Sequence, residues 1–440
     1  MSPSHPPSLY SSPADAQRAP AEDLLYVSCL HEGTGVRAPD FLAVVDAHEG
    51  RIVHETPMPN VGDELHHFGW NRCSSACHGP DRSHLVMPGF RSSRIHILDV
   101  SGDPRRPTID KVIEPDELVR ETGYTRPHTV HCMPGGNVVL SMLGDADGNG
   151  AGGFACLDAS TFEVKGRWEN GGERPGLNYD FWYQPRQDVL VSSEFGEPNA
   201  YEPGFDPEDV GRGRYGQRLH FWNLTSRELE QTIDLGERGL VPLELRMRHD
   251  PDAAEGFAAA TLSSAVWRFH RANGSWAADP VIETEAVELE GWPMPVPSLM
   301  TDMVLSMDDR FLYVANWFHG NLQQYDVSDG EHPRLTGELW LGGLLGKPSD
   351  AGRELDGGPQ MLQLSLDGSR LYVTNSLYST WDNQFYPGLR SWLLKVDCDP
   401  AGGMTVDPGF FVDFHDRPGG PARAHEVRLS GGDCTSEVFT

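Results

Sequence analysis

The sequence lacks any run of eighteen consecutive apolar residues, so it offers no candidate for a membrane-spanning helix. Its first twenty residues are rich in Ser, Pro and Ala. They contain neither the apolar core of a secretory signal peptide nor a twin-arginine motif. These absences predict a cytoplasmic protein with no membrane partner.

Cysteine and basic residues are also scarce. The 440 residues include seven cysteines, an odd number at irregular spacing, which does not match a disulfide framework and indicates mostly reduced thiols. Lys and Arg together number 35 against 65 Asp and Glu, for a formal net charge of −30. A nucleic acid is therefore not an expected partner, because phosphate contacts require a basic face.

Long amphipathic helices are missing, whereas 48 Gly and 34 Pro predict many turns between short strands. Residues 305–316 (LSMDDRFLYVAN) and 364–375 (LSLDGSRLYVTN) match almost residue for residue. An Asp-Asp or Asp-Gly turn between two apolar runs predicts a β-hairpin. Each repeat also contains a second strand pair, so the repeat unit has four strands.

Four-stranded units at a spacing of about sixty residues are typical of β-propeller blades, and the chain has room for about seven. The sequence therefore predicts an all-β protein, a seven-bladed β-propeller. We expect one propeller domain over residues 23–440, preceded by a short disordered tail over residues 1–22.

The repeat also predicts which residues face the central channel. When the copies are aligned on the Ser-x-Asp turn, Thr301, Gln360, His128 and His425 start innermost strands, and Cys73 falls within one residue of that position. The neighbouring position collects four acids, namely Asp180, Glu244, Asp302 and Glu426. Because innermost strands line the channel, these distant residues are expected to become neighbours.

Residues 63–78 (DELHHFGWNRCSSACH) concentrate the side chains that bind transition metals. The candidates here and downstream are His66, His67, Cys73, His128, His131, His319 and His425. A single histidine in this position is more often structural, but several that converge by register suit copper, zinc, iron or nickel. Strand alternation aims His128 and His131 at opposite faces, which leaves open which of them is a ligand. Cys73 fits either a metal ligand or a thiolate nucleophile.

Longer motifs carry a family resemblance from about residue 26 to the C-terminus. They are residues 63–67, 69–71, 73–75, 128–129 with 131–132, 179–185, 308–313, 357–361, 376–379, 381–382, 384–387, 424–426 and 431–434. In these motifs the sequence resembles the selenium-binding protein / methanethiol oxidase family. The resemblance implies a seven-bladed propeller that holds copper. It also implies an enzyme that oxidises methanethiol with O2 and water to formaldehyde, hydrogen sulfide and hydrogen peroxide.

The same resemblance implies roles for single residues. His66, His67, one or both of His128 and His131, and His425 would be copper ligands. Cys73 would be the selenium-binding and catalytic cysteine, and His319 the catalytic histidine. The family commonly has Cys-Ser-Ser-Cys, whereas Ala76 is inserted here, so the role of Cys77 stays open.

The expected partners are a small-molecule thiol and O2, and the oligomeric state is left open. The alternative function is a non-catalytic selenium- or thiol-binding propeller scaffold, which would not require convergent histidines. A calcium-dependent hydrolase or lactonase would require a centre of oxygen ligands, and imidazoles dominate here.

Overall fold

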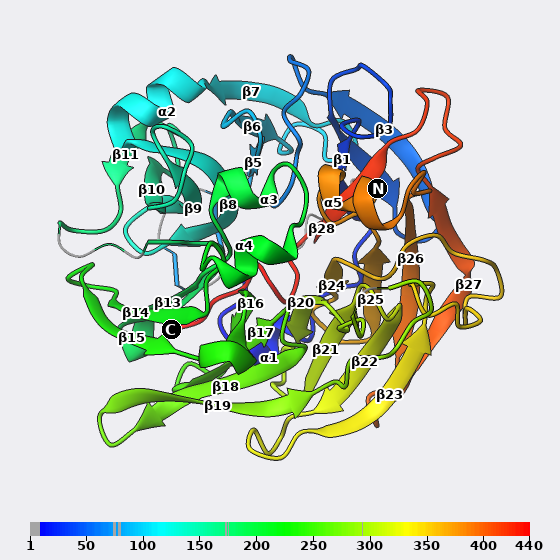
Figure 1. Cartoon of the computed structure of the whole chain (residues 1–440). Helices are drawn as coiled ribbons and strands as arrows, with labels where there is room; N and C mark the ends of the chain where they lie inside the picture. The colour runs from blue at the N-terminus through cyan, green and yellow to red at the C-terminus, as the bar shows by residue number, and fades with distance from the viewer. Residues whose placement is uncertain (1–8, 74–75, 78–80, 172–173, 175, 293) are drawn as a thin grey trace.

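The computed structural model describes residues 9–440 except 74–75, 78–80, 172–173, 175 and 293. Seven four-stranded antiparallel sheets are arranged as blades around a central channel (Figure 1). The predicted all-β, seven-bladed propeller is confirmed. From the innermost strand outward the blades are β28-β1-β2-β3, β4-β5-β6-β7, β8-β9-β10-β11, β12-β13-β14-β15, β16-β17-β18-β19, β20-β21-β22-β23 and β24-β25-β26-β27.

The strands are short, as the density of turn residues predicts. Their bounds in the first four blades are β28 Arg423–Leu429, β1 Leu24–Leu30, β2 Phe41–Asp46, β3 Arg51–Pro57; β4 Gly69–Trp70, β5 His84–Pro88, β6 Ile95–Asp99, β7 Thr108–Ile113; β8 Tyr124–Met133, β9 Asn137–Asp145, β10 Gly153–Asp158, β11 Val164–Arg167; β12 Phe181–Gln184, β13 Val189–Ser193, β14 Arg218–Asn223 and β15 Leu229–Asp234. In the other three they are β16 Pro242–Met247, β17 Glu255–Ala260, β18 Ala265–Ala272, β19 Ser275–Glu283; β20 Met300–Leu305, β21 Phe311–Asn316, β22 Asn321–Asp326, β23 Arg334–Trp340; β24 Leu362–Leu364, β25 Arg370–Thr374, β26 Trp392–Cys398 and β27 Met404–Asp413.

Burial falls from the channel to the rim. All residues of the innermost strands β16, β20 and β28 are buried, because the two faces of each strand pack against the blades on either side and its free edge lines the channel. The outermost strand β15 alternates between exposed and half-buried residues, as expected for a strand with one face in water. Polar residues on innermost strands are consequently held out of water.

The two matching repeats form the same turn. Ser306 Oγ donates to Asp308 and accepts from the Phe311 N–H (2.6 and 2.8 Å), and Ser365 Oγ donates to Asp367 in the equivalent turn (2.7 Å). Asp309 and Gly368 have φ values of 60° and 72°. An Asp-Asp or Asp-Gly sequence suits this turn because Gly and Asp tolerate the left-handed conformation.

The chain ends close the ring. Strand β28, from the C-terminal end of the chain, pairs antiparallel with β1, with Leu25 opposite Leu429 and Cys29 opposite Ala424. This pairing makes a C-terminal strand the innermost strand of the first blade. It places the residues of β28, including His425, beside the segment that follows β3.

Helices are few and short. They are α1 Pro13–Ala16, α2 Pro115–Thr122, α3 Pro198–Tyr201, α4 Pro207–Gly211 and α5 Ser379–Phe385, with 3-10 turns η1 Pro185–Gln187 and η2 Gly236–Gly239. In Figure 1, α3, α4 and α5 lie near the centre of the ring, and Tyr201 and Trp381 share one apolar cluster. Among the described residues, no helix combines the length and apolar character needed to cross a bilayer.

The segment before β1 differs from the expected tail over residues 1–22, of which residues 1–8 lie outside the described part. Tyr10 and Ala16 pack into the apolar cluster of the last two blades. Glu22 accepts hydrogen bonds from Arg370 (2.7 and 2.9 Å) and from the Tyr372 hydroxyl (2.5 Å). The compositional signal of disorder missed these few anchors, because their partners lie some 350 residues away.

We expect Glu22→Gln to lower the free energy of unfolding by about 2–3 kcal/mol, since it breaks an ion pair that is 5% exposed at Glu22 and 20% at Arg370. Urea unfolding measures the change. The matched control is Glu49→Gln, whose partner Arg51 is largely exposed, and it should leave the unfolding midpoint unchanged. Equal midpoints for both variants would show that the N-terminal anchor contributes nothing.

Candidate metal centre and its surroundings

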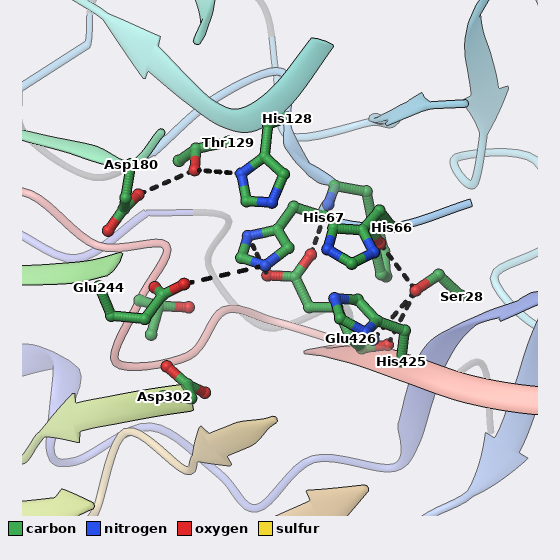
Figure 2. Close-up of polar contacts among 12 residues, drawn as sticks. Ser28, His66, His67, His128, Thr129, Asp180, Glu244, Asp302, His425 and Glu426 are labelled. Carbon is green, nitrogen blue, oxygen red and sulfur yellow. Dashed lines mark hydrogen bonds and ion pairs between the residues drawn. The ribbon is translucent and has the colours of Figure 1, made fainter. Parts of the chain in front are cut away.

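Four histidines meet at one end of the channel. His66 and His67 precede β4, His128 lies on β8 and His425 on β28. Ring centroids are 3.6 Å apart for His66 and His425, 4.0 Å for His67 and His128, and 5.0 Å for His66 and His128. Their side chains point toward one another (Figure 2), and each residue is at most 4% exposed.

The His66-His67 pair can face one point because it is not part of a strand. Glu64 has a φ of 53°, in the left-handed region, which breaks the alternation of an extended chain. The Glu64 carboxylate accepts the Ser379 N–H (2.8 Å), and Ser28 Oγ donates to the His66 carbonyl (2.9 Å). The two contacts fix the segment to α5 and to β1.

Hydrogen bonds at Nδ1 orient two of the rings. His425 Nδ1 lies 2.8 Å from the Ser376 carbonyl, so Nδ1 carries the proton and Nε2 a lone pair. His128 Nδ1 lies 3.1 Å from Thr129 Oγ1, which itself donates to Asp180 (2.8 Å). Since that hydroxyl proton is committed to Asp180, the His128 ring donates from Nδ1 and its Nε2 also carries a lone pair.

Three ring nitrogens of this histidine cluster are buried and have no hydrogen-bond partner within the described ranges. They are Nε2 of His67, His128 and His425. Leaving such atoms unpaired costs about 1–3 kcal/mol each, so an arrangement of this kind calls for a further group. One nitrogen from each of His66, His67 and His128 lies within 4.8 Å of the others. Imidazole nitrogens so placed fit copper, zinc, iron or nickel.

Burial keeps the four imidazoles neutral. It lowers the pKa of His66, His67 and His128 well below 6.5 and that of His425 to about 3, and the other histidines lower the pKa of the first three further. A neutral imidazole keeps the lone pair that a metal needs. Across the neutral range these side chains do not have to release a proton before a cation binds.

Two carboxyl groups flank His67. Glu244 Oε1 lies 3.9 Å from Nε2, and Glu426 Oε1 lies 4.0 Å from Nδ1. Burial raises the pKa of Glu426 to about 8, against the opposing effect of Arg428, and it raises the pKa of Glu244 well above its usual value. Carboxyl groups with such pKa values can hold or accept a proton near neutral pH.

Two buried arginines connect these acids. Arg246 pairs with Asp180 (3.1 Å), Glu244 (3.0 Å) and Asp302 (3.2 Å). Arg428 pairs with Glu426 (2.8 Å), and its Nε donates to the Phe68 carbonyl (2.7 Å).

The alignment had placed all four of these acids at the channel but missed both arginines. The sequence did contain a signal for the arginines. Glu-x-Arg occurs in both β16 (Glu244 and Arg246) and β28 (Glu426 and Arg428), with the arginine one residue before the end of the strand in each case.

A cavity of about 30 Å³ adjoins the histidines. Its lining is mostly apolar and comprises His66, Phe90, His128, Tyr179, Phe195, Tyr201, Val241, Leu243, Thr261, Leu262, Leu377, Tyr378 and Trp381. Because one water molecule needs about 10–15 Å³ on this measure, the cavity holds a group of about two non-hydrogen atoms. The site thus combines nitrogen donors with a small apolar space.

His131 lies apart from the four histidines. Its ring packs against Phe181, Trp182 and Tyr183 of β12, with centroids 5.0 to 6.2 Å away. Burial, together with Arg428 and Arg246, lowers its pKa to about 3. Of the pair that the sequence left open, His128 is therefore the residue at the centre.

His319 and Cys73 also lie elsewhere. His319 Nε2 is 3.0 Å from the Val296 carbonyl, in the turn after β21. Cys73 follows β4 and lies against Cys77 and Cys132. Neither is among the described residues that line the cavity. The alignment placed Cys73 within one residue of the His128 position, whereas the structure places it against Cys132, four residues further along β8. The two-residue strand β4 explains the slip, since it gives little sequence to align.

A family model described as 56 kDa selenium binding protein (SBP56) matches residues 4–440. The chain belongs to this family. It is 48% identical to a protein named methanethiol oxidase from Xenopus laevis and 47% identical to one from Homo sapiens, in each case over 98% of both chains.

Solved structures agree with the family on the fold. The chain superposes with a TM-score of 0.94 on a hypothetical selenium-binding protein from Sulfolobus tokodaii, at 46% identity over 98% of this chain and 99% of the other. A putative 6-phosphogluconolactonase from Bacteroides uniformis matches 93% of this chain and all of its own, with a TM-score of 0.56 and 11% identity. That last likeness shows a shared fold alone.

We expect the metal-free protein to lose stability as the pH falls below about 6.5, because the unfolded chain then binds protons that the buried histidines do not. For His425, the loss is about 2.5 kcal/mol between pH 7 and pH 4.5. His425→Gln should reduce the pH dependence by that amount in urea unfolding with a chelator present.

Asp302 and Glu426 change the free energy of unfolding in the opposite direction. Burial raises their pKa values to about 7 and about 8, so acidification stabilises the folded state at these two residues. Both remain in the variant, so their contribution cancels in the comparison. His332→Gln, at an exposed histidine, is the control. If His425→Gln keeps the pH dependence of the unchanged protein, His425 is not a buried neutral imidazole.

Proposed function

We propose that the protein is a copper-dependent methanethiol oxidase, which converts methanethiol, O2 and water to formaldehyde, hydrogen sulfide and hydrogen peroxide. The observation that carries the proposal is the convergence of four neutral imidazoles beside a small apolar cavity. The name methanethiol oxidase that relatives at 47–48% identity carry supports the choice of substrate.

His66, His67, His128 and His425 would hold the copper ion, since their neutral rings converge and three of them present an unpaired Nε2. Bound copper would supply a soft Lewis acid for the thiolate sulfur and a one-electron couple for O2. The chain supplies the rest. Ser376 and Thr129 fix the ring orientations, which normally matters 10–100-fold in metal affinity.

Protons and water would be controlled by the neighbouring residues. Glu244 and Glu426 lie within 4.0 Å of His67, close enough to receive the thiol proton directly or through one water molecule. Phe90, Tyr378 and Trp381 close the cavity with apolar surface, which excludes bulk water and favours a methyl group.

The catalytic roles of Cys73 and His319, the ligand role of His131 and the cytoplasmic location stay predictions. Because neither Cys73 nor His319 lines the cavity in the described structure, the proposal places no reacting atom on them.

The test is the electron paramagnetic resonance signal of bound Cu(II), together with hydrogen peroxide release that depends on methanethiol. We expect His128→Ala and His425→Ala to lose the signal and the activity, each by at least about tenfold. His131→Ala is the matched control on the same strand and should retain the Cu(II) signal.

A Cu(II) signal that survives in His128→Ala contradicts the ligand set. Copper bound in the unchanged protein without peroxide release would instead favour the thiol-binding scaffold.

A second prediction concerns substrate size. Leu243→Ala removes a side chain that lines the cavity, so it should raise kcat/KM for ethanethiol relative to methanethiol by about tenfold. Leu305→Ala, at a buried position that packs between blades, is the control and should leave the ratio unchanged. If Leu243→Ala lowers both values equally, the cavity does not select the substrate.

A further inference from the structure

A cluster of three cysteines lies outside the histidine centre. The sulfur atoms of Cys73, Cys77 and Cys132 lie within 4.8 Å of one another, and the residues are 2%, 5% and 1% exposed. Cys73 and Cys77 flank a short stretch whose residues 74–75 lie outside the described part, and Cys132 lies on β8. Sequence analysis left Cys77 without a role and did not connect Cys132 with either.

The structure pairs the Cys132 sulfur with each of the other two sulfurs. The Cα atoms of Cys73 and Cys77 lie 5.9 and 6.8 Å from that of Cys132, and both distances fall within the range of about 4.4–6.8 Å that disulfides span. A sulfur atom forms only one disulfide bond, so the two pairings are alternatives. Whichever pair is joined, the third sulfur lies beside the bond as a thiol.

We propose that Cys73, Cys77 and Cys132 form a redox site at which a peroxide generates one disulfide, and that Cys132 exchanges its partner between Cys73 and Cys77. Hydrogen peroxide oxidises one thiolate to a sulfenic acid, and a second thiol attacks that sulfur and releases water. In total, two thiols and one hydrogen peroxide give one disulfide and two water molecules. The sulfurs supply both electrons, so no other co-reactant is required.

The exchange step follows from the position of the third sulfur. When Cys73 and Cys132 are joined, the Cys77 thiolate attacks the Cys132 sulfur, and Cys73 leaves as the thiolate when its bond breaks. One disulfide and one thiolate are present before and after the step, so the electrons balance. The site therefore has one free thiol at a time, Cys73 in one state and Cys77 in the other.

Neighbouring groups favour Cys132 as the shared partner. The Cys73 N–H donates to the Cys132 sulfur (2.6 Å), a contact that stabilises the Cys132 thiolate when no disulfide is present. The Tyr183 hydroxyl donates to the Cys132 carbonyl (2.6 Å) and lies 3.7 Å from the Cys77 sulfur. These contacts hold two sulfurs within reach of the third.

Either disulfide connects the same two neighbouring blades. Cys73 and Cys77 follow β4, the innermost strand of one blade, and Cys132 lies on β8, the innermost strand of the next. The Ala76 N–H donates to the Val438 carbonyl (3.2 Å), which ties the inserted residue to the C-terminal segment. Because both disulfides link the same blades, the exchange requires no change in the order or pairing of strands.

This redox site is separate from the histidine centre. Cys132 lies four residues from His128 along β8, or roughly 13 Å at the rise of an extended strand. The two sites share no residue, and oxidation of the thiols by added peroxide requires no bound metal. The inference therefore does not depend on the proposed oxidase activity.

The experiment adds hydrogen peroxide to the reduced full chain in the presence of a metal chelator. Acid then stops thiol exchange, alkylation labels the remaining thiols, and peptide mass spectrometry identifies the disulfides. We expect both the Cys73–Cys132 and the Cys77–Cys132 disulfides, with a loss of two thiols for about one equivalent of peroxide. The matched control is Cys156→Ser, at a buried free cysteine in a blade core, which should keep both disulfides.

Two variants test the shared partner. Cys77→Ser should form only the Cys73–Cys132 disulfide and Cys73→Ser only the Cys77–Cys132 disulfide, and circular dichroism confirms that each variant is folded. Slow alkylation of the folded, oxidised protein after removal of the peroxide tests the exchange itself. The label should accumulate on one of the two cysteines beyond its initial share, because exchange regenerates the thiol that reacts faster.

His425→Ala separates this inference from the proposed function, since it should lose the histidine-bound Cu(II) signal and keep both disulfides. Retention of all three thiols after peroxide treatment would overturn the redox site. So would a Cys73–Cys77 disulfide as the main product. A single disulfide at Cys132 in the unchanged protein, or label in the same proportions as the initial thiols, would overturn the exchange.

Discussion

The structure at the channel depends on the burial of imidazole nitrogens that face one another instead of hydrogen-bond partners. Nε2 of His67, His128 and His425 is buried and unpaired within the described chain. Each such atom is costly by itself, and a folded protein keeps few of them. Burial also prevents protonation, so the rings can lie as close as 3.6 Å without mutual charge repulsion. Burial without a hydrogen-bond partner therefore costs free energy and at the same time leaves the nitrogen lone pairs available to a cation.

The propeller provides the rigidity that this arrangement needs. Innermost strands contact their neighbours around the channel, and each brings a few residues from a distant part of the sequence. His128 comes with β8, while His425 comes with β28, which closes the ring against β1. The segment with His66 and His67 is fixed by Glu64 and Ser28. The pairing of β28 with β1 that closes the ring therefore also brings His425 to the other histidines.

A layer of paired charges supports the histidines from within the channel. Arg246 and Arg428 neutralise part of the charge of Asp180, Glu244, Asp302 and Glu426. Because Glu244 and Glu426 also flank His67, this layer both holds the channel together and supplies groups that can carry protons. The small apolar cavity is lined by His66 and His128, and none of these four acids lines it.

The sequence by itself determined the repeat and much of the site composition. Matching Ser-x-Asp turns predicted the repeated blades, because a turn is determined by the residues that form it, and these are adjacent in the sequence. The same register brought Asp180, Glu244, Asp302 and Glu426 to the channel. Family motifs pointed to His66, His67, His128 and His425.

Only the tertiary structure decided the contacts between residues far apart. It placed His128 rather than His131 at the centre, a choice that alternation along β8 left open because it shows only that the two side chains face opposite ways. It joined Cys132 to Cys73 and Cys77, and it packed Tyr10 and Glu22 where composition predicted a tail. In each case the deciding partner lies in another blade or beyond a turn. The alternation of residues along the chain predicts each strand by itself. Which strands and side chains come into contact depends on how the ring of blades closes.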